Sequence, residues 1–162
     1  MHDLKFPIGV ELESIWYLVL PGDRVSAGDK VDSVSWAVQL VFADESELGF
    51  HWQLDQGSGC LVATSTLPHH PFEVRQDASG RWPELIGLRL SDAIQVVHET
   101  DRGATLWSVR LAFDQDRSLV VALGEKDESG SPTYLPDGLI VTDSEVVASS
   151  YVVPGAPQGA WG

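Results

Sequence analysis

Two adjacent histidines are the side chains of this chain best suited to metal chemistry. His69 and His70 stand between two prolines, and Glu73 follows three residues after His70. Imidazole and carboxylate groups are common zinc ligands. Neighbouring residues of a strand point to opposite faces, so both histidines can bind one ion only at a turn, which the flanking prolines permit. We therefore name His69, His70 and Glu73 as candidate metal ligands, with exposed linker histidines as the alternative interpretation.

Carboxylates gather in two short polar segments. Glu45 and Glu47 lie in the first, and Asp114 and Asp116 lie in the second. Neither segment has the spacing of a calcium-binding loop, which favours solvated turns. If the two segments lie on one side of the molecule, these four carboxylates form a docking surface for a cationic partner.

Aromatic side chains suggest a second kind of contact surface. The chain has six tryptophans, and aromatic residues beside acidic loops suit a partner-binding patch or a small-ligand groove. We name His51, Trp52 and Tyr134 as candidate ligand-binding or partner-binding residues. Core packing is the alternative interpretation for each aromatic side chain taken singly.

Catalytic sequence motifs are missing. The chain has no nucleophile elbow, phosphate-binding loop, dinucleotide fingerprint, zinc-protease motif or paired C-x-x-C. This favours a non-enzymatic protein without a cofactor, although the absence of motifs does not exclude an enzyme. The single cysteine, Cys60, cannot form an internal disulfide, which favours a reducing compartment.

The elements that would position these residues come from an internal repeat. Residues 35–52 share their pattern with residues 106–123. The matched segments are 8–12 with 86–90, 36–42 with 107–113, and 61–64 with 139–142. The two copies differ by one insertion each, in residues 21–30 (the first insertion loop) and residues 124–138 (the second insertion loop). Since loops tolerate changes of length better than paired strands do, the pattern indicates a duplicated unit.

The hydrophobic pattern within each copy has a period of two, which is typical of half-buried antiparallel strands. Trp36, Val38, Leu40 and Phe42 share one face, and Trp107, Val109, Leu111 and Phe113 repeat it. A five-residue polar connection and a second alternating segment follow in each copy, as in a hairpin. We expect an all-β fold with at most minor helix. Two four-stranded antiparallel halves would close into a sandwich or barrel with pseudo-two-fold symmetry.

The chain is long enough for one domain. We expect copy one at about residues 4–65, a linker at 66–81, copy two at about 82–153 and a mobile tail at 154–162. Two segments are ambiguous: residues 91–99 fit a strand or a helical turn, and we favour a strand. The segment after Thr142 has a possible helix start, but its β-branched residues favour a final strand.

The net charge of the chain limits the classes of macromolecule that it can bind. Ten basic against 24 acidic residues give a net charge of -14, which repels nucleic acid and anionic lipid. The amino-terminal segment lacks a signal-peptide pattern, and the longest apolar run near it has six residues, so we expect a soluble cytoplasmic protein that does not bind membranes. Seven arginines to three lysines suits a GC-rich bacterial genome.

The leading hypothesis is therefore a small acidic, non-enzymatic protein that docks another protein, as an immunity protein or accessory subunit would, and the charge favours a basic partner. Two alternatives stay open: a small-molecule-binding β-barrel, and a metal-dependent enzyme that uses the linker histidines. Formation of a homodimer through an exposed edge strand is also open.

Overall fold

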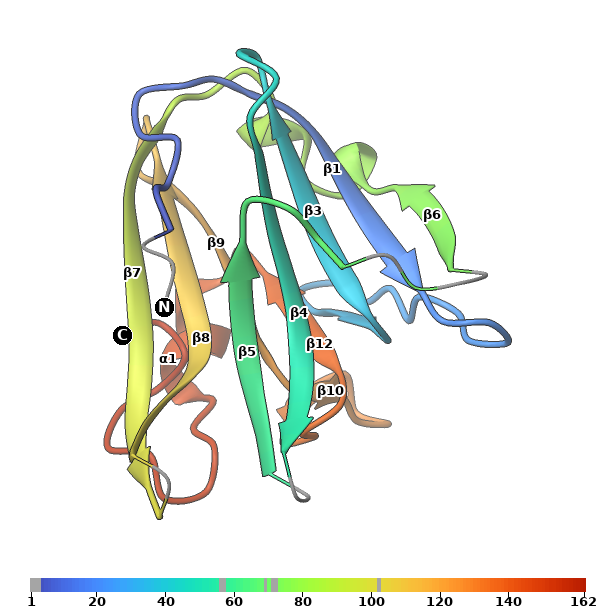
Figure 1. Ribbon diagram of the computed structural model, residues 1–162, viewed down its shortest axis with the longest axis vertical. Coiled ribbons are helices and arrows are strands. Elements are labelled where there is room, and N and C mark those ends of the chain that lie inside the picture. The colour runs from blue at the N-terminus through green and yellow to red at the C-terminus, as the bar shows by residue number, and fades with distance from the viewer. Residues whose placement is uncertain (1–3, 56–57, 69, 71–72, 102) are drawn as a thin grey trace.

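The fold consists mainly of two five-stranded antiparallel sheets (Figure 1). The structure is a computed structural model that describes residues 4–55, 58–68, 70, 73–101 and 103–162. The first sheet has the order β5-β4-β3-β1-β6, with β1 (Leu12–Val19), β3 (Ala37–Phe42), β4 (Glu47–Asp55), β5 (Ser58–Thr64) and β6 (Val74–Asp77). The second has the order β2-β12-β9-β8-β7, with β2 (Asp32–Val34), β7 (Leu90–Thr100), β8 (Gly103–Phe113), β9 (Arg117–Leu123) and β12 (Leu139–Thr142). The prediction of a mainly β fold is confirmed.

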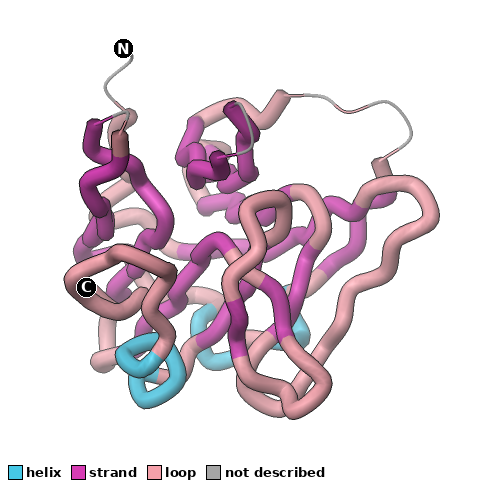
Figure 2. The backbone as a smooth tube through the Cα atoms, turned by 90° about the horizontal axis from the view of Figure 1, so that it is seen from below, coloured by secondary structure: helices cyan, strands magenta, loops and turns pink. Residues whose placement is uncertain are grey.

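Smaller elements connect the sheets. The strands β10 (Glu125–Lys126) and β11 (Pro132–Thr133) form a two-stranded ribbon of their own. Two 3₁₀ turns, η1 (Ser79–Arg81) and η2 (Pro83–Leu85), precede β7, and one short helix, α1 (Glu145–Ser150), follows β12. Figure 2 shows the helical segments as short turns among strands and loops. Among the described residues, no helix is long and apolar enough to cross a membrane.

The alternating pattern of the sequence becomes the inner faces of the two sheets. In both hairpins the paired strands place apolar side chains opposite each other, where burial of each contributes about 1.5–3 kcal/mol. The pairs are Val38 with Phe50, Leu40 with Leu48, Val109 with Val121, and Leu111 with Leu119, and all eight side chains are fully buried. Buried residues of both sheets belong to one hydrophobic core.

The two sheets share the connectivity of four strands. The order β5-β4-β3-β1 in the first sheet corresponds to β12-β9-β8-β7 in the second. Each sheet also has a fifth strand that the predicted four-stranded halves lacked. The predicted linker supplies β6, which pairs with β1, and β2 of copy one crosses to the second sheet, where it pairs with β12. Both short strands cover an edge that would otherwise expose unpaired backbone groups.

The repeated Ile-Gly segments before β1 and β7 pair with each other. Gly9 N donates to Leu90 O at 2.7 Å, and Gly87 N donates to Leu12 O at 2.8 Å. Gly9 and Gly87 have φ angles of 86° and 89°, a left-handed conformation that strains other residues. Hydrogen bonds between the segments that precede β1 and β7 therefore join the two sheets.

One residue of the predicted inner face does not occupy it. Trp107 is fully buried, whereas its counterpart Trp36 precedes β3 and is partly exposed. Val34 is paired in the second sheet and Ala37 is paired in the first, so the chain crosses between sheets at residues 35–36. Trp36 therefore lies in the crossing and is not part of the strand.

The carboxyl-terminal segment departs from the predicted final strand. Residues 145–150 form α1, because the Ser144 hydroxyl caps the helix by accepting a hydrogen bond from Val147 N at 3.3 Å. The tail then packs on the second sheet: Ala160 is fully buried, and its carbonyl accepts a hydrogen bond from the Ser108 hydroxyl at 2.7 Å. The Arg110 guanidinium lies 4.5 Å from the ring centroid of Trp161.

Candidate functional site

The two insertion loops, about 100 residues apart in sequence, meet in the structure. The Lys126 ammonium donates to Ala27 O at 2.9 Å, and Lys126 N donates to the Ser33 hydroxyl. Two cavities lie where these loops meet. The smaller has a volume of about 350 Å³ and is lined by residues of both loops, including Arg24 and Asp137. The two insertion loops thus form one surface.

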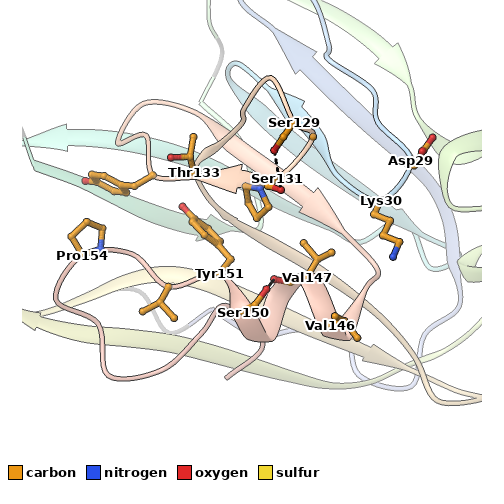
Figure 3. A pocket seen from close by; sticks show the side chains of 14 residues that line it. Asp29, Lys30, Ser129, Ser131, Thr133, Val146, Val147, Ser150, Tyr151 and Pro154 are labelled. Atoms are coloured by element: carbon orange, nitrogen blue, oxygen red, sulfur yellow. Dashed lines mark hydrogen bonds between the residues drawn. The ribbon is translucent and has the colours of Figure 1, made fainter.

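The larger cavity is an open groove of about 740 Å³, which we call the insertion groove. It is lined by Asp29 and Lys30 of the first loop, residues 129–134 of the second loop, and residues 146–147, 150–152 and 154. Figure 3 shows Asp29 and Lys30 at one end of the groove and Pro154 at the other. The side chains of the second loop and those of α1 lie on opposite walls.

The groove gathers exposed apolar side chains. In the described part of the chain, seven large hydrophobic side chains are exposed, and three of them line the groove: Val146 at 76%, Val152 at 46% and Tyr134 at 40%. Exposed apolar residues gathered in one place mark interaction surfaces, whereas single ones are unremarkable. Tyr134 is the one predicted contact residue that lies here.

The wall formed by the second loop is polar and internally braced. The Asp127 carboxylate accepts hydrogen bonds from Ser129 N at 2.9 Å, from the Ser129 hydroxyl at 2.6 Å and from Ser131 N at 3.0 Å. The hydrogen bond from the Ser129 hydroxyl is the main cause that lowers the pKa of Asp127. Local hydrogen bonds of this kind hold a turn in one conformation, so the loop presents its hydroxyl groups in a defined arrangement.

Tyr151 closes the floor of the groove. Its hydroxyl donates to Leu123 O, and its ring packs edge-on against Trp107 with the centroids 5.8 Å apart. A Cβ atom on Gly124 would lie 2.6 Å from the Tyr151 hydroxyl oxygen, so only glycine allows the second loop to begin this close to the core. Burial raises the pKa of Tyr151, and its hydroxyl stays protonated.

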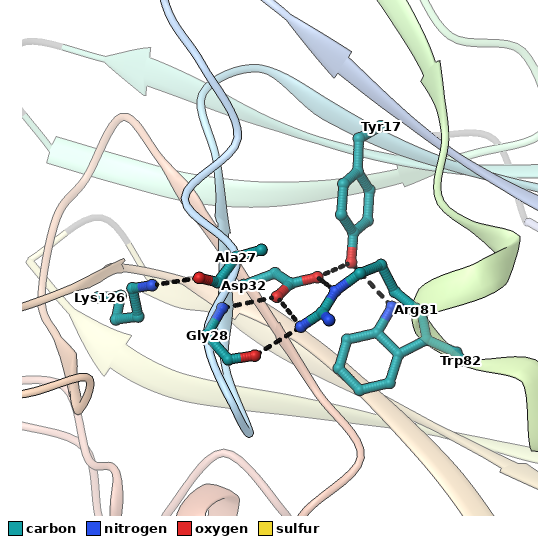
Figure 4. Close-up of polar contacts among 7 residues, drawn as sticks. All are labelled: Tyr17, Ala27, Gly28, Asp32, Arg81, Trp82 and Lys126. Atoms are coloured by element: carbon teal, nitrogen blue, oxygen red, sulfur yellow. Dashed lines mark hydrogen bonds and ion pairs between the residues drawn. The ribbon is translucent and has the colours of Figure 1, made fainter.

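A buried ionic network anchors the first loop (Figure 4). The fully buried Asp32 carboxylate binds Arg81 in a forked arrangement, with Nη2 to Oδ1 at 2.7 Å and Nε to Oδ2 at 3.0 Å. It also accepts hydrogen bonds from the Tyr17 hydroxyl at 2.8 Å and from Gly28 N at 3.2 Å. Arg81 Nη2 donates in turn to Gly28 O, so the network holds both backbone groups of Gly28.

Two side chains of the network, Tyr17 and Arg81, have a raised pKa. Burial, followed by the nearby Asp32 charge, raises the pKa of Tyr17. Trp82 Nε1 donates to the Tyr17 hydroxyl oxygen at 2.8 Å. The hydrogen bond to Asp32 raises the pKa of Arg81, whose side chain is 40% exposed. The network therefore combines a neutral tyrosine with an ion pair, and it connects β1, β2 and η1 to the first loop.

The two polar segments with the predicted carboxylates, which we call the acidic turns, lie at the other end of the molecule from β10, at the top of Figure 1. Ala43 N donates to Glu11 O, and Asp114 N donates to Arg89 O, while Glu11 and Arg89 form a bridge to each other. The four predicted carboxylates, Glu45, Glu47, Asp114 and Asp116, are exposed at the two tips of this end. The structure thus brings the two tips to the same end but does not join them to Tyr134.

His51 and Trp52 belong to a third location, an aromatic cluster around Trp36. The Trp36 ring lies 5.2 Å from the rings of both His51 and Trp52, and 6.0 Å from His70. Trp52 Nε1 donates to Ser35 O at 2.7 Å. Only 8% of His51 is exposed, so it offers little surface to a partner, and its burial lowers its pKa.

The candidate metal ligands are only partly covered by the structure. His69 lies outside the described residues, and His70 and Glu73 lie within them. Within residues 4–55, 58–68, 70, 73–101 and 103–162, no group of three or more His, Cys, Asp or Glu residues is arranged to hold a metal ion. The metal site stays a prediction.

The sequence analysis located the two insertion loops but missed the Asp32 network. Asp32 and Arg81 are 49 residues apart, and neither belongs to a repeated segment or a motif, so nothing local indicates their pairing. In comparisons with protein-family models, curated proteins and solved structures, nothing matched this chain.

Proposed function

We propose that this protein is a non-enzymatic binding module that docks another protein in the insertion groove. The observation that carries the proposal is the meeting of the two insertion loops around exposed apolar side chains, above all Val146 and Val152. We expect the specific function at these insertions, because they lie together in space and the rest of the scaffold is repeated. Loops commonly carry the binding residues of a protein on a rigid framework.

The composition of the groove supports binding over catalysis. The ionisable side chains of its lining are Asp29, Lys30, Tyr134 and Tyr151. The lining includes no histidine, cysteine or glutamate, the side chains that most often serve with aspartate as acid, base or nucleophile near neutral pH. The proton of the Tyr151 hydroxyl is engaged by Leu123 O.

The same features favour a macromolecule over a small ligand. A small molecule is usually enclosed on most of its surface, whereas Val146 stands 76% exposed at the groove. The space between the sheets, where a barrel would hold a ligand, contains fully buried side chains such as Trp107, Phe42 and Phe50. A role as an accessory or immunity-like protein with a basic partner agrees with the net charge of -14. The cytoplasm of a bacterium is the location that we propose for it.

A duplicated sandwich is the architecture that we propose for this module. The shared order of four strands, the reciprocal hydrogen bonds of Gly9 and Gly87, and the left-handed residues Glu45 and Asp116 at equivalent hairpin tips support it. Two related halves that each bury one apolar face against the other would produce this arrangement.

Site-specific crosslinking tests the proposed docking. A photoreactive amino acid at position 146, in cells that express the protein natively, should form a discrete adduct with another protein. The matched control is position 74, because Val74 is also exposed, at 51%, but lies on β6 of the first sheet. Equal adducts at both positions, or none at position 146, would refute docking in the groove.

A further inference from the structure

We infer that the occupant of the insertion groove is an extended, cationic segment of the partner protein, with apolar and basic residues in alternation. This inference rests on the proposed function and specifies the chemistry of the partner. It follows from two features of the groove, its unlike walls and the charge around it.

The unlike walls favour an extended segment. One wall carries the exposed hydroxyl groups of Ser129, Ser131 and Thr133, and the other carries Val146 and the neighbouring residues of α1 (Figure 3). Successive side chains of an extended chain point to opposite sides. Alternating residues would therefore place apolar side chains on the valines and polar ones on the hydroxyl wall, while the hydroxyl groups can bind the backbone of the segment.

The charge around the groove favours basic residues on the polar side. Asp127 and Glu128 immediately precede Ser129 on one wall, and Glu145 immediately precedes Val146 on the other; all three are exposed. The lining adds Asp29 and Lys30, whose opposite charges cancel in the sum. The Lys126 ammonium, which donates to Ala27 O in an exposed position, adds one positive charge nearby. The three exposed carboxylates thus outnumber this ammonium group, so lysine or arginine of a partner would meet a net negative charge, an arrangement that raises both specificity and association rate.

Selection from a random peptide library tests the inference. Displayed peptides of roughly ten residues, about 33 Å long when extended, are selected on the full-length protein. The same selection is made on the Val146→Asp/Val152→Asp variant, with Val74→Asp as the matched control. Circular dichroism checks that the variants are folded, and the exposure of all three side chains makes this the expected result.

The expected result is a set of peptides that bind the native protein and the Val74→Asp control but not the groove variant. Their lysine and arginine content should exceed that of the library by about twofold or more. Glu128→Gln with Glu145→Gln, which neutralises two exposed carboxylates beside the groove, should weaken the binding of a selected peptide several-fold, and so should added salt. Groove-dependent peptides that are neutral or acidic would overturn the cationic occupant and leave docking intact. A selection without groove-dependent peptides would overturn the inference and count against the proposed function as well, and the crosslinking at position 146 then decides the latter on its own.

Discussion

Replacing Arg81 with methionine should destabilise the protein by about 3 kcal/mol. Methionine keeps much of the aliphatic stem but removes the guanidinium, and with it the two hydrogen bonds to Asp32 at 2.7 and 3.0 Å. The Asp32 carboxylate is fully buried, and it would retain only the hydrogen bonds from the Tyr17 hydroxyl and Gly28 N. Removing one partner of a buried pair costs about 3–5 kcal/mol; we take the lower end because Arg81 is 40% exposed.

Urea unfolding followed by tryptophan fluorescence measures the loss, and the melting temperature should fall by about 6–12 °C, since each kcal/mol is worth about 2–4 °C in a domain of this size. Arg24→Met is the matched control, because Arg24 is an exposed arginine of the first loop, which the Asp32 network anchors. It should change stability by less than about 0.5 kcal/mol.

A double-mutant cycle tests the reasoning more sharply. In Asp32→Asn/Arg81→Met the charge that needs Arg81 is gone, so the combined loss should be smaller than the sum of the two single losses by about 1 kcal/mol or more. Additive losses, or a cost below about 1 kcal/mol for Arg81→Met alone, would refute the view that Arg81 compensates a buried carboxylate.

Three further predictions address the scaffold. Trp107→Ala should cost about 3–5 kcal/mol, and Trp36→Ala clearly less in the same urea assay, because only Trp107 is fully buried. His51, whose pKa burial lowers, contributes stability that is complete above its unfolded pKa of about 6.5 and is lost as the pH falls below it; unfolding measured across pH should show this loss, and His51→Gln should remove it. Gly87→Ala should cost about 1–2 kcal/mol through its φ of 89° alone, since no atom lies within 4 Å of the added Cβ, whereas Gly80→Ala, in open space without a positive φ, should cost little.

Each of these predictions has a contrary outcome. Equal losses for the two tryptophans would contradict the assigned crossing at residues 35–36. An unchanged pH profile in His51→Gln would assign the acid sensitivity to other groups, and equal effects of the two glycine substitutions would show that the left-handed conformation is not strained.

Local patterns account for most of the strands that the sequence predicted. An alternation of apolar and polar residues indicates which side chains face the core, and a few consecutive residues are enough to recognise it. Both hairpins and the strand β7 could therefore be predicted from residues 35–52, 91–99 and 106–123. The end of the chain shows the limit of local propensity. Val146, Val147 and their neighbours favour a strand, but the Ser144 cap and packing beside the core produce α1 instead.

The candidate site could be predicted only in outline. Comparison of the two copies located the insertions in residues 21–30 and 124–138, and Tyr134 was named among the contact residues. It could not show that the two loops meet, and it grouped Tyr134 with His51, Trp52 and the acidic turns, which lie elsewhere.

The sequence by itself determined the strand pattern, the repeated inner faces and the acidic charge, because each of these depends on residue type and short-range spacing. Only the tertiary structure decided that β2 joins the second sheet, that Asp32 pairs with Arg81, and that the two insertion loops form one groove. These features depend on contacts between residues far apart in the chain. Such contacts are selected by the burial and hydrogen bonding of the whole fold, and no local pattern specifies them.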